Sequence, residues 1–215
     1  MSDPEADGGA EHDGESIGWP IDLDGVAETV VTTLGPNGLW NVAALGVFAG
    51  DPARARTWGN TRTRRNFHRQ GEGYVQFVHD PVDFVDAALT ITERDDPVLD
   101  SADAWVRVAV ESVDSGTIDG TDWEEWTLEP LESVIEHETV TPINRGFGAV
   151  IEATVAASRL EVDGYDRTDL ESRLDHALDV VDRAGGTRER QAFSRLVAVS
   201  EWTPSRDRRA VIEWL

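Results

Sequence analysis

The chain has 215 residues, of which 40 % are hydrophobic, and this length is sufficient to bury a core without disulfides or metals. It contains no cysteine, which excludes a disulfide framework, a cysteine nucleophile, thiolate zinc sites and iron–sulfur clusters. No apolar run approaches the roughly 20 residues of a membrane span, and the acidic N-terminus lacks the apolar core of a signal peptide. We therefore expect a cytoplasmic protein with no membrane partner.

The charge balance is strongly acidic. Asp and Glu total 42 against 19 basic residues, which gives a net charge of −23, and every basic residue is an arginine. Because phosphate backbones repel such a chain, we expect no nucleic-acid partner. An acidic excess without lysine resembles the proteins of extreme halophiles and suggests a haloarchaeal source, where molar salt shortens the Debye length to about 3 Å. Against this background, clustered arginines are the informative charges.

The first half of the chain carries strand patterns. Alternating β-branched residues over Val26–Leu34, a turn signal at 35–38 and an apolar run over 39–48 predict a β-hairpin. A short helix is expected over 60–70, capped by Asn60 or Thr61 and ended by Gly71, and a helix or turn is expected over 81–89. Further strands are expected over 55–59, 73–79, 104–113 and 123–128.

The hydrophobic period becomes helical after Glu129. Apolar residues spaced three and four apart predict three helices, around 143–155, 170–181 and 193–200. Strands followed by helices indicate an α+β fold, in which a small barrel precedes a three-helix C-terminal unit. We expect an acidic disordered tail over 1–18, a barrel domain over 19–129, a helical domain over 130–203 and a C-terminal tail over 204–215.

The segment 58–66 concentrates positive charge at the expected start of a helix. It holds Arg62, Arg64 and Arg65, together with the hydroxyls of Thr61 and Thr63. Free backbone N–H groups and the helix dipole favour an anion at such a place, and arginine adds a planar, charged fork. The alternative is an ordinary capped helix whose arginines pair with nearby acids. The residues alone favour the two interpretations equally.

Several sequence blocks resemble known families. Arg62-Thr63-x-x-Asn66, followed by the strand pattern at 73–78, is similar to the phosphate-site element of flavin-reductase-like split barrels. The blocks 28–34, 41–47, 60–66 and 142–160 together resemble an archaeal and bacterial family, domain-of-unknown-function family 447, from about residue 23 to residue 202. This resemblance implies an FMN-binding split barrel followed by a helical domain, assembled as a homodimer. It implies no particular reaction.

The resemblance also implies roles for individual residues. Within the block Asn60-Thr61-Arg62-Thr63, it implies that the last three residues hold the FMN phosphate and that Asn66 braces their loop. The backbone around Asn41, Val42 and Ala43 would face the edge of the isoalloxazine ring. The chain departs from the family pattern at Ala43-Ala44, where many split barrels carry a proline or serine against the flavin.

Two further pairs of residues are candidates near this site. Asn144 and Arg145 open the first expected C-terminal helix, where Arg145 could reach a substrate anion or form an ion pair that joins the domains. Trp40 and Trp58 flank the expected cleft and could stack on the flavin, lie in the core or lie in a dimer interface. None of the five histidines has the spacing of a metal site, so no metal is expected.

The sequence leaves three functions open. The first is an FMN-binding flavoprotein that acts as an oxidoreductase with a small-molecule redox partner. The second is a non-catalytic FMN- or ligand-binding protein, and the third is a small-molecule enzyme without flavin. The chain has no G-x-S-x-G element and no Walker loop, which argues against a serine hydrolase and a P-loop NTPase.

Overall fold

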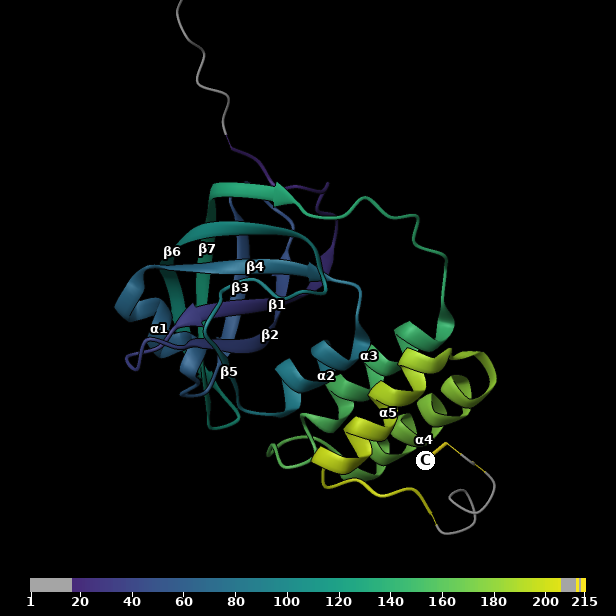
Figure 1. The fold of residues 1–215 in the computed structure, drawn as a ribbon. Coiled ribbons are helices and arrows are strands. Elements are labelled where there is room, and N and C mark those ends of the chain that lie inside the picture. Colours follow the sequence, from purple (N-terminus) through teal and green to yellow (C-terminus); the bar gives the residue numbers. More distant parts are fainter. Residues whose placement is uncertain (1–16, 206–211, 213) are drawn as a thin grey trace, which may run out of the picture.

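The computed structural model describes residues 17–205, 212, 214 and 215. It consists of a β-barrel followed by a helical unit, and the two lie side by side (Figure 1). The expected acidic tail therefore lies outside the described residues except for its last two positions. Among the described helices, none is both long and apolar enough to cross a membrane.

Six strands close the barrel in the order β1-β4-β6-β7-β3-β2, because β2 pairs again with β1. A short seventh strand, β5, pairs with the free edge of β2. All described pairings are antiparallel. The strands are β1 Val26–Leu34, β2 Trp40–Phe48, β3 Ala53–Trp58, β4 Glu72–Val78, β5 Thr92–Arg94, β6 Ala102–Ile118 and β7 Thr121–Ile135.

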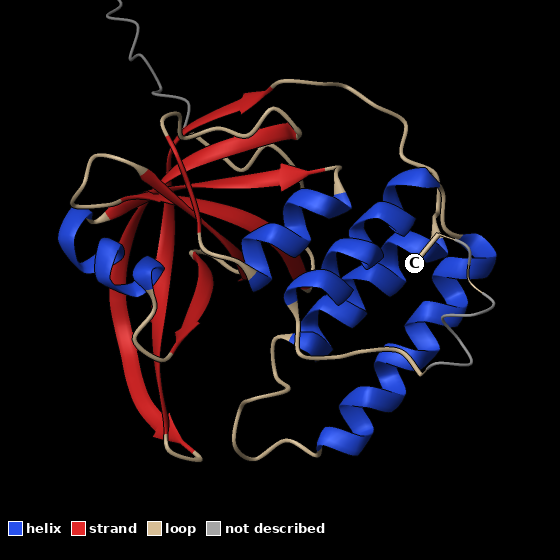
Figure 2. Cartoon of the chain, turned by 60° about the horizontal axis from the view of Figure 1, so that its bottom comes forward, coloured by secondary structure: helices blue, strands red, loops and turns tan. Residues whose placement is uncertain are grey.

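The helices lie in two places. Helix α1 (Arg62–Gln70) packs on the barrel, whereas α2 (Pro81–Leu89) lies with α3 (Arg145–Ala157), α4 (Arg167–Ala184) and α5 (Thr187–Val199) (Figure 2). Leucine and alanine side chains on the inner faces of this group, together with Phe193 and Trp202, form its core. A smaller cluster, which includes Val42 and Phe84, joins the outer face of β1 and β2 to α2. This contact fixes the helical unit against the barrel.

Local sequence signals set the ends of α1 as expected. The side chain of Thr61 caps the helix by accepting a hydrogen bond from the backbone N–H of Arg64. Gly71 ends the helix with φ of 67°, a left-handed conformation that glycine adopts without a Cβ clash. The predicted hairpin of β1 and β2 is also present, with Leu34 opposite Trp40.

One expectation about the elements is wrong. The strand pattern does not stop at Glu129, because β7 continues to Ile135 and pairs with β6 along its whole length. The outer halves of β6 and β7 are polar and exposed, so alternation did not reveal them. Helix α2 packs in the helical core through Val85 and on the barrel through Phe84. Ile212 also packs in the helical core.

Candidate functional site

The closed barrel has few strand pairs between β2 and β3, which leaves an opening there. These strands pair only at Val47 with Ala55 and at Phe48 with Arg54. Beyond this point β2 turns to β5, with which its residues 40–42 pair. The segment 43–46 of β2 therefore has a strand partner on one edge alone, and alternate backbone N–H and C=O groups there point into the opening.

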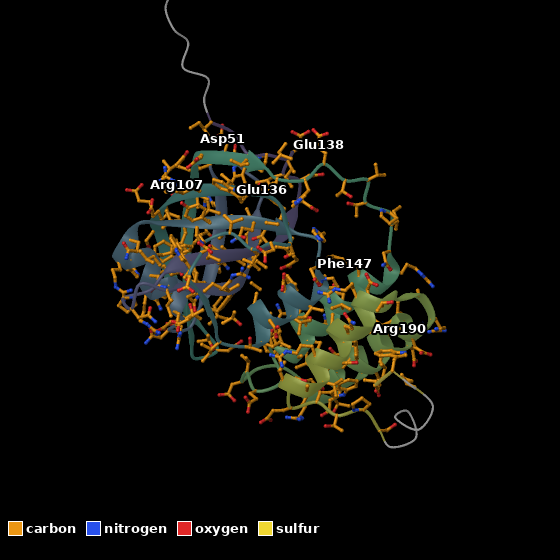
Figure 3. The ribbon with its side chains drawn as sticks, viewed as in Figure 1. Asp51, Arg107, Glu136, Glu138, Phe147 and Arg190 are labelled. Atoms are coloured by element: carbon orange, nitrogen blue, oxygen red, sulfur yellow. The ribbon has the colours of Figure 1, made fainter. Side chains whose placement is uncertain are left out.

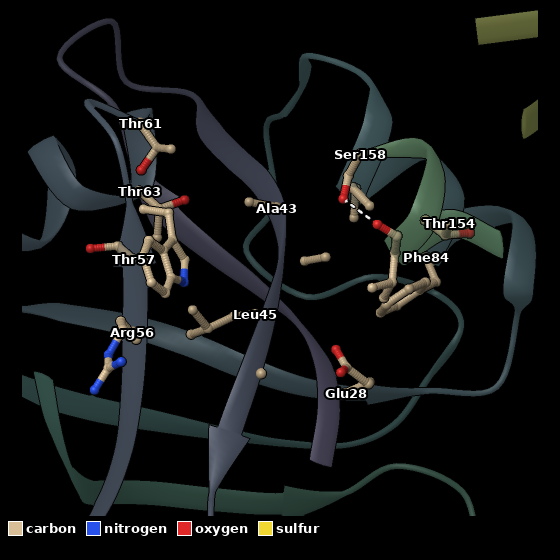
Figure 4. A pocket seen from close by; sticks show the side chains of 16 residues that line it. Glu28, Ala43, Leu45, Arg56, Thr57, Thr61, Thr63, Phe84, Thr154 and Ser158 are labelled. Atoms are coloured by element: carbon tan, nitrogen blue, oxygen red, sulfur yellow. Dashed lines mark hydrogen bonds between the residues drawn. The ribbon is translucent and has the colours of Figure 1, made fainter. Parts of the chain in front are cut away.

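A cavity of about 310 Å³ occupies this opening (Figure 4). We call it the gap cavity. Helices α2 and α3 form its far wall, so the helical unit of the same chain covers the opening. Its lining residues are Glu28, Ala43, Ala44, Leu45, Gly46, Arg56, Thr57, Trp58, Thr61, Thr63, Phe84, Ala87, Ala88, Thr154, Val155 and Ser158.

The first turn of α1 supplies hydrogen-bond donors to one end of the gap cavity. Thr61 and Thr63 lie together at this end (Figure 4). The Thr63 side chain is buried, and its hydroxyl has no hydrogen-bond partner among the described residues. The backbone N–H groups of Arg62 and Thr63 have no acceptor within the helix, because they belong to its first turn. No acidic residue lies in that turn, so this end suits an anion.

Arg56 is the cationic side chain among those that line the gap cavity. Its guanidinium bonds Glu125 at 2.8 Å and lies over the ring of Trp123, 4.3 Å from the ring centroid. Its Nε atom is buried and has no hydrogen-bond partner in the described structure. Sequence reasoning missed Arg56, although an arginine within a short alternating strand was a usable signal.

Glu28 lies at the other end of the gap cavity, away from Thr61 and Thr63 (Figure 4). The residue is exposed overall, but the partial burial of its carboxyl raises the pKa, and the nearby Arg159 lowers it by less. Glu28 also lines a second cavity of about 500 Å³. Sequence reasoning missed it as a site residue, even though it is a lone carboxylate in a strand of β-branched residues.

The second cavity adjoins the gap cavity, because Glu28 and Phe84 line both. Its remaining lining residues are mainly apolar and come from β4 and α3, and among them Phe147 points toward the barrel (Figure 3). The side chain of Glu152 is the other carboxylate in its wall. We call this space the adjoining cavity.

A buried ion-pair network fixes α1 against the barrel. The carboxylate of Glu124 in β7 bonds Arg64 at 2.6 Å, His68 at 2.9 Å and the hydroxyl of Ser112 at 2.6 Å. Burial alone would raise the pKa of Glu124, but these three hydrogen bonds outweigh it and hold that pKa below its usual range. The network holds the first turn of α1, and thus Thr63, at the gap cavity.

The structure divides the predicted phosphate motif between two sides of α1. Thr61 and Thr63 line the gap cavity, whereas Arg62 turns away and bonds Glu93 of β5 at 2.7 Å. Arg62 therefore does not line the cavity that the two threonines line. Consecutive helical side chains are rotated by about 100°, so neighbours in the first turn face different directions.

The remaining predicted cofactor residues occupy several environments. Asn66 is buried and braces α1 by donating to the backbone oxygen and hydroxyl of Thr33, a bracing role as expected. Asn60 accepts hydrogen bonds from Arg65 outside the gap cavity. Ala43 lines the gap cavity as expected, but Val42 packs in the core and Asn41 lies at another concavity, so these two side chains do not reach it.

Asn144 and Arg145 do not line either cavity. Asn144 caps α3 and bonds Glu189 of α5 at 2.9 Å, which joins two helices of one unit. Helix α3 is about 20 Å long, and its opposite end, at Thr154 and Ser158, reaches the gap cavity. The helix that begins at Asn144 therefore contributes to the site through its C-terminal end.

The two candidate tryptophans, Trp40 and Trp58, lie in different environments. Trp58 is 46 % exposed and lines the gap cavity. Trp40 packs edge-on against Tyr74, with ring centroids 5.3 Å apart, and is absent from the lining of that cavity. Among the described residues, no group of three or more potential ligands is placed to hold a metal ion.

Comparison with known structures identifies the fold. A crystal structure of an FMN-bound protein from Methanosarcina mazei, assigned to family DUF447, is similar at 24 % identity and a TM-score of 0.67, covering 83 % of this chain and 96 % of that one. Component B of nitrilotriacetate monooxygenase from Bacillus cereus is more distant, at 17 % identity and a TM-score of 0.40 over 56 % of this chain and 76 % of that one. The chain therefore shares the fold of the protein from Methanosarcina mazei, an α+β split barrel with a helical unit, which confirms the expected fold class.

Family comparison covers both halves of the molecule. No curated protein matches the chain. Residues 27–137 match the N-terminal domain of the protein family of unknown function DUF447, and residues 144–198 match a second segment described by the same name. The first match contains nearly the whole barrel, and the second contains helices α3 and α4 and nearly all of α5. The expected resemblance is confirmed: the chain belongs to the DUF447 family.

Proposed function

We propose that this protein binds FMN in the gap cavity and acts as an FMN-dependent oxidoreductase. The observation that carries the proposal is Thr63, a buried residue whose hydroxyl opens into the cavity and has no hydrogen-bond partner among the described residues. This hydroxyl is free to donate to a bound phosphate, and a hydrogen bond to a charged group is stronger than one between neutral groups. The FMN-bound relative from Methanosarcina mazei supports the same cofactor.

The residues present fit the parts of FMN. The hydroxyls of Thr61 and Thr63, with the free N–H groups of the first turn of α1, would hold the phosphate, and Arg56 is the cationic side chain in the lining of the cavity. The unpaired edge of β2 at 43–46 offers backbone donors and acceptors to the polar edge of the ring. The volume of about 310 Å³ lies at the lower end of the range of about 300–1,000 Å³ for small-molecule sites.

When bound, FMN supplies the electron-transfer chemistry. The protein's own residues then bind FMN, orient it and shield it from water. Phe84 and the alanines of α2 exclude water from the far wall. Glu28 is exposed at the end of the cavity, and the partial burial of its carboxyl raises its pKa. The small-molecule redox partner would enter the adjoining cavity, which shares Glu28 and Phe84 with the gap cavity.

We also propose a homodimer that works in the cytoplasm of a salt-adapted cell. Trp58 supports the dimer, because it is 46 % exposed at the gap cavity, and large exposed aromatics are typical of interfaces. The net charge of −23 and the lack of lysine support the salt-adapted, haloarchaeal setting.

The test is to load the purified protein with FMN in molar KCl and add NADH, NADPH or a deazaflavin donor anaerobically. Bleaching of the bound flavin and its reoxidation by an added acceptor support an oxidoreductase. Tight FMN binding without reduction by any donor would support a non-catalytic FMN-binding protein instead. Failure to bind FMN would contradict both functions.

A further inference from the structure

The face of α1 opposite the gap cavity carries a second group of positive charges. Arg62, Arg65 and Arg69 follow one another at intervals of three and four residues, so they lie within roughly 60° of one face of the helix. They line a concavity of about 320 Å³ that is separate from the gap cavity in its lining residues. We call it the arginine pocket.

The arginine pocket has an excess of positive charge. The three guanidiniums face a single carboxylate in its lining, that of Glu93, which bonds Arg62 at 2.7 Å and also accepts from Asn37. The chain as a whole has a net charge of −23 and only 19 basic residues. Three of these residues around one concavity reverse the sign of the charge there. A structural role would need no such excess, because one carboxylate can pair with only one or two of these side chains.

Two buried amides form the floor of the arginine pocket. Asn66 is 3 % exposed, and its amide is fully engaged: it donates to Thr33 and accepts from Arg69 at 2.8 Å. Asn41 is 5 % exposed and lines the same concavity, and its side chain has no hydrogen-bond partner among the described residues. Its amide is not one of the described polar atoms that are buried without a partner, so it opens into the concavity, where it can bond a ligand.

The arginines retain the capacity to bind an anion. The guanidinium of Arg65 bonds the backbone oxygen and the side-chain oxygen of Asn60 through one of its nitrogens, so its other nitrogens are available. Arg69 likewise uses one terminal nitrogen for Asn66. Guanidinium groups bind phosphate oxygens with two parallel hydrogen bonds, which are stronger than those between neutral groups.

We propose that the arginine pocket is a second, FMN-independent binding site for a small molecule that carries a phosphate or pyrophosphate group. Arg65 and Arg69 bind the phosphate oxygens, and Asn41 bonds a polar atom of the ligand at the floor. Glu93 keeps Arg62 in place and weakens the anion site by its charge. The site lies across α1 from Thr63, so the two sites can be occupied together.

The test is calorimetric titration of the FMN-saturated protein with inorganic pyrophosphate and, separately, orthophosphate, at the lowest KCl concentration that keeps the native circular dichroism spectrum. We expect one pyrophosphate per chain. The Arg65→Ala and Arg69→Ala variants should each weaken binding at least tenfold, whereas Arg173→Ala, which removes an arginine from helix α4, should change it less than twofold. Glu93→Gln should tighten binding at least threefold, a gain that a purely structural role for the pocket does not produce.

A protein that binds neither anion, or whose affinity is unchanged in both Arg65→Ala and Arg69→Ala, would overturn the proposal. Loss of pyrophosphate binding in Thr63→Val equal to that in Arg65→Ala would also overturn it, because the anion would then occupy the gap cavity. The same titrations on FMN-free protein separate this site from the proposed function. Pyrophosphate binding that persists without FMN supports the arginine pocket even if FMN does not bind. A distinctly stronger response to pyrophosphate than to orthophosphate indicates a ligand with linked phosphates, such as a nucleotide.

Discussion

Arg62 and Thr63 are neighbours in the chain but serve opposite sides of helix α1. Thr63 is buried at the gap cavity, whereas the guanidinium of Arg62 bonds Glu93 of β5 at 2.7 Å. A single helical turn thus separates a hydroxyl-lined anion site from an arginine-lined one. For this reason, residues that the sequence predicts to form one phosphate site lie in two different environments in the fold.

The network around Glu124 predicts sensitivity to acid. Because the folded-state pKa of Glu124 is lowered, its stabilisation is present above the pKa of about 4.3 of an unfolded glutamate and is lost as the pH falls below that value. Glu124→Gln should lower the free energy of unfolding at pH 7 by about 2–4 kcal/mol, since Arg64 loses its buried partner. Urea unfolding between pH 3 and pH 7 measures this.

The control for that series is Glu129→Gln, on the same strand but exposed. It should leave the unfolding free energy within about 0.5 kcal/mol of the unmodified protein. If Glu124→Gln and Glu129→Gln have the same stability across the pH range, the network does not fix α1.

Glu28 predicts the opposite dependence of stability on pH, because its pKa is raised and not lowered. Its pKa is raised mainly by burial, so the charged form costs stability as the pH rises above the pKa of an unfolded glutamate. Glu28→Gln should therefore raise the melting temperature at pH 7, and the gain should shrink toward pH 4. Thermal melts of this variant beside Asp24→Asn, an exposed acid just before the same strand, check the sign. An equal or lower melting temperature for Glu28→Gln at pH 7 would contradict it.

The acidic composition predicts stabilisation by salt. At a net charge of −23 the folded chain repels itself, and added KCl screens this repulsion. The melting temperature should rise steadily between low and molar KCl. A melting temperature that stays flat over this range would remove the argument for salt adaptation.

The proposed dimer predicts the mass of the protein in solution. Light scattering in molar KCl should give twice the chain mass of 23.6 kDa. Trp58→Ser should shift the protein toward the monomer, because it removes an exposed aromatic from the proposed interface. A mass of one chain with FMN fully bound would contradict the dimer and leave the helical unit of the same chain as the cover of the cavity.

Local signals in the sequence predicted the elements that depend on near neighbours. The β1–β2 hairpin follows from alternation around a turn, and the ends of α1 follow from Thr61 and Gly71. Strand β5 has only three residues and exists because Arg94 pairs with the distant Trp40, so no local pattern could indicate it.

The residues of the site were predictable, like the elements, only where local sequence determines them. Thr61 and Thr63 were expected, but the direction of Arg62 depends on Glu93, which lies in β5 and approaches only in the folded chain. The part of α3 that reaches the gap cavity is its C-terminal end, because the packing of α3 on α2 and α4 sets which end meets the barrel. Asn144 and Arg145 lie at the other end of the helix, away from the gap cavity.

The most direct test of the central claim is a fluorescence titration of the protein and its Thr63→Val variant with FMN and with riboflavin. Valine keeps the shape of threonine but removes the hydroxyl that opens into the gap cavity, and a hydrogen bond to a charged group contributes about 1.5–3 kcal/mol. We predict at least tenfold weaker FMN binding by Thr63→Val, little change in riboflavin binding, and FMN binding by Arg62→Ala within threefold of the unmodified protein. Equal losses for FMN and riboflavin in Thr63→Val, or a larger loss of FMN binding in Arg62→Ala, would contradict the placement of the FMN phosphate in the gap cavity.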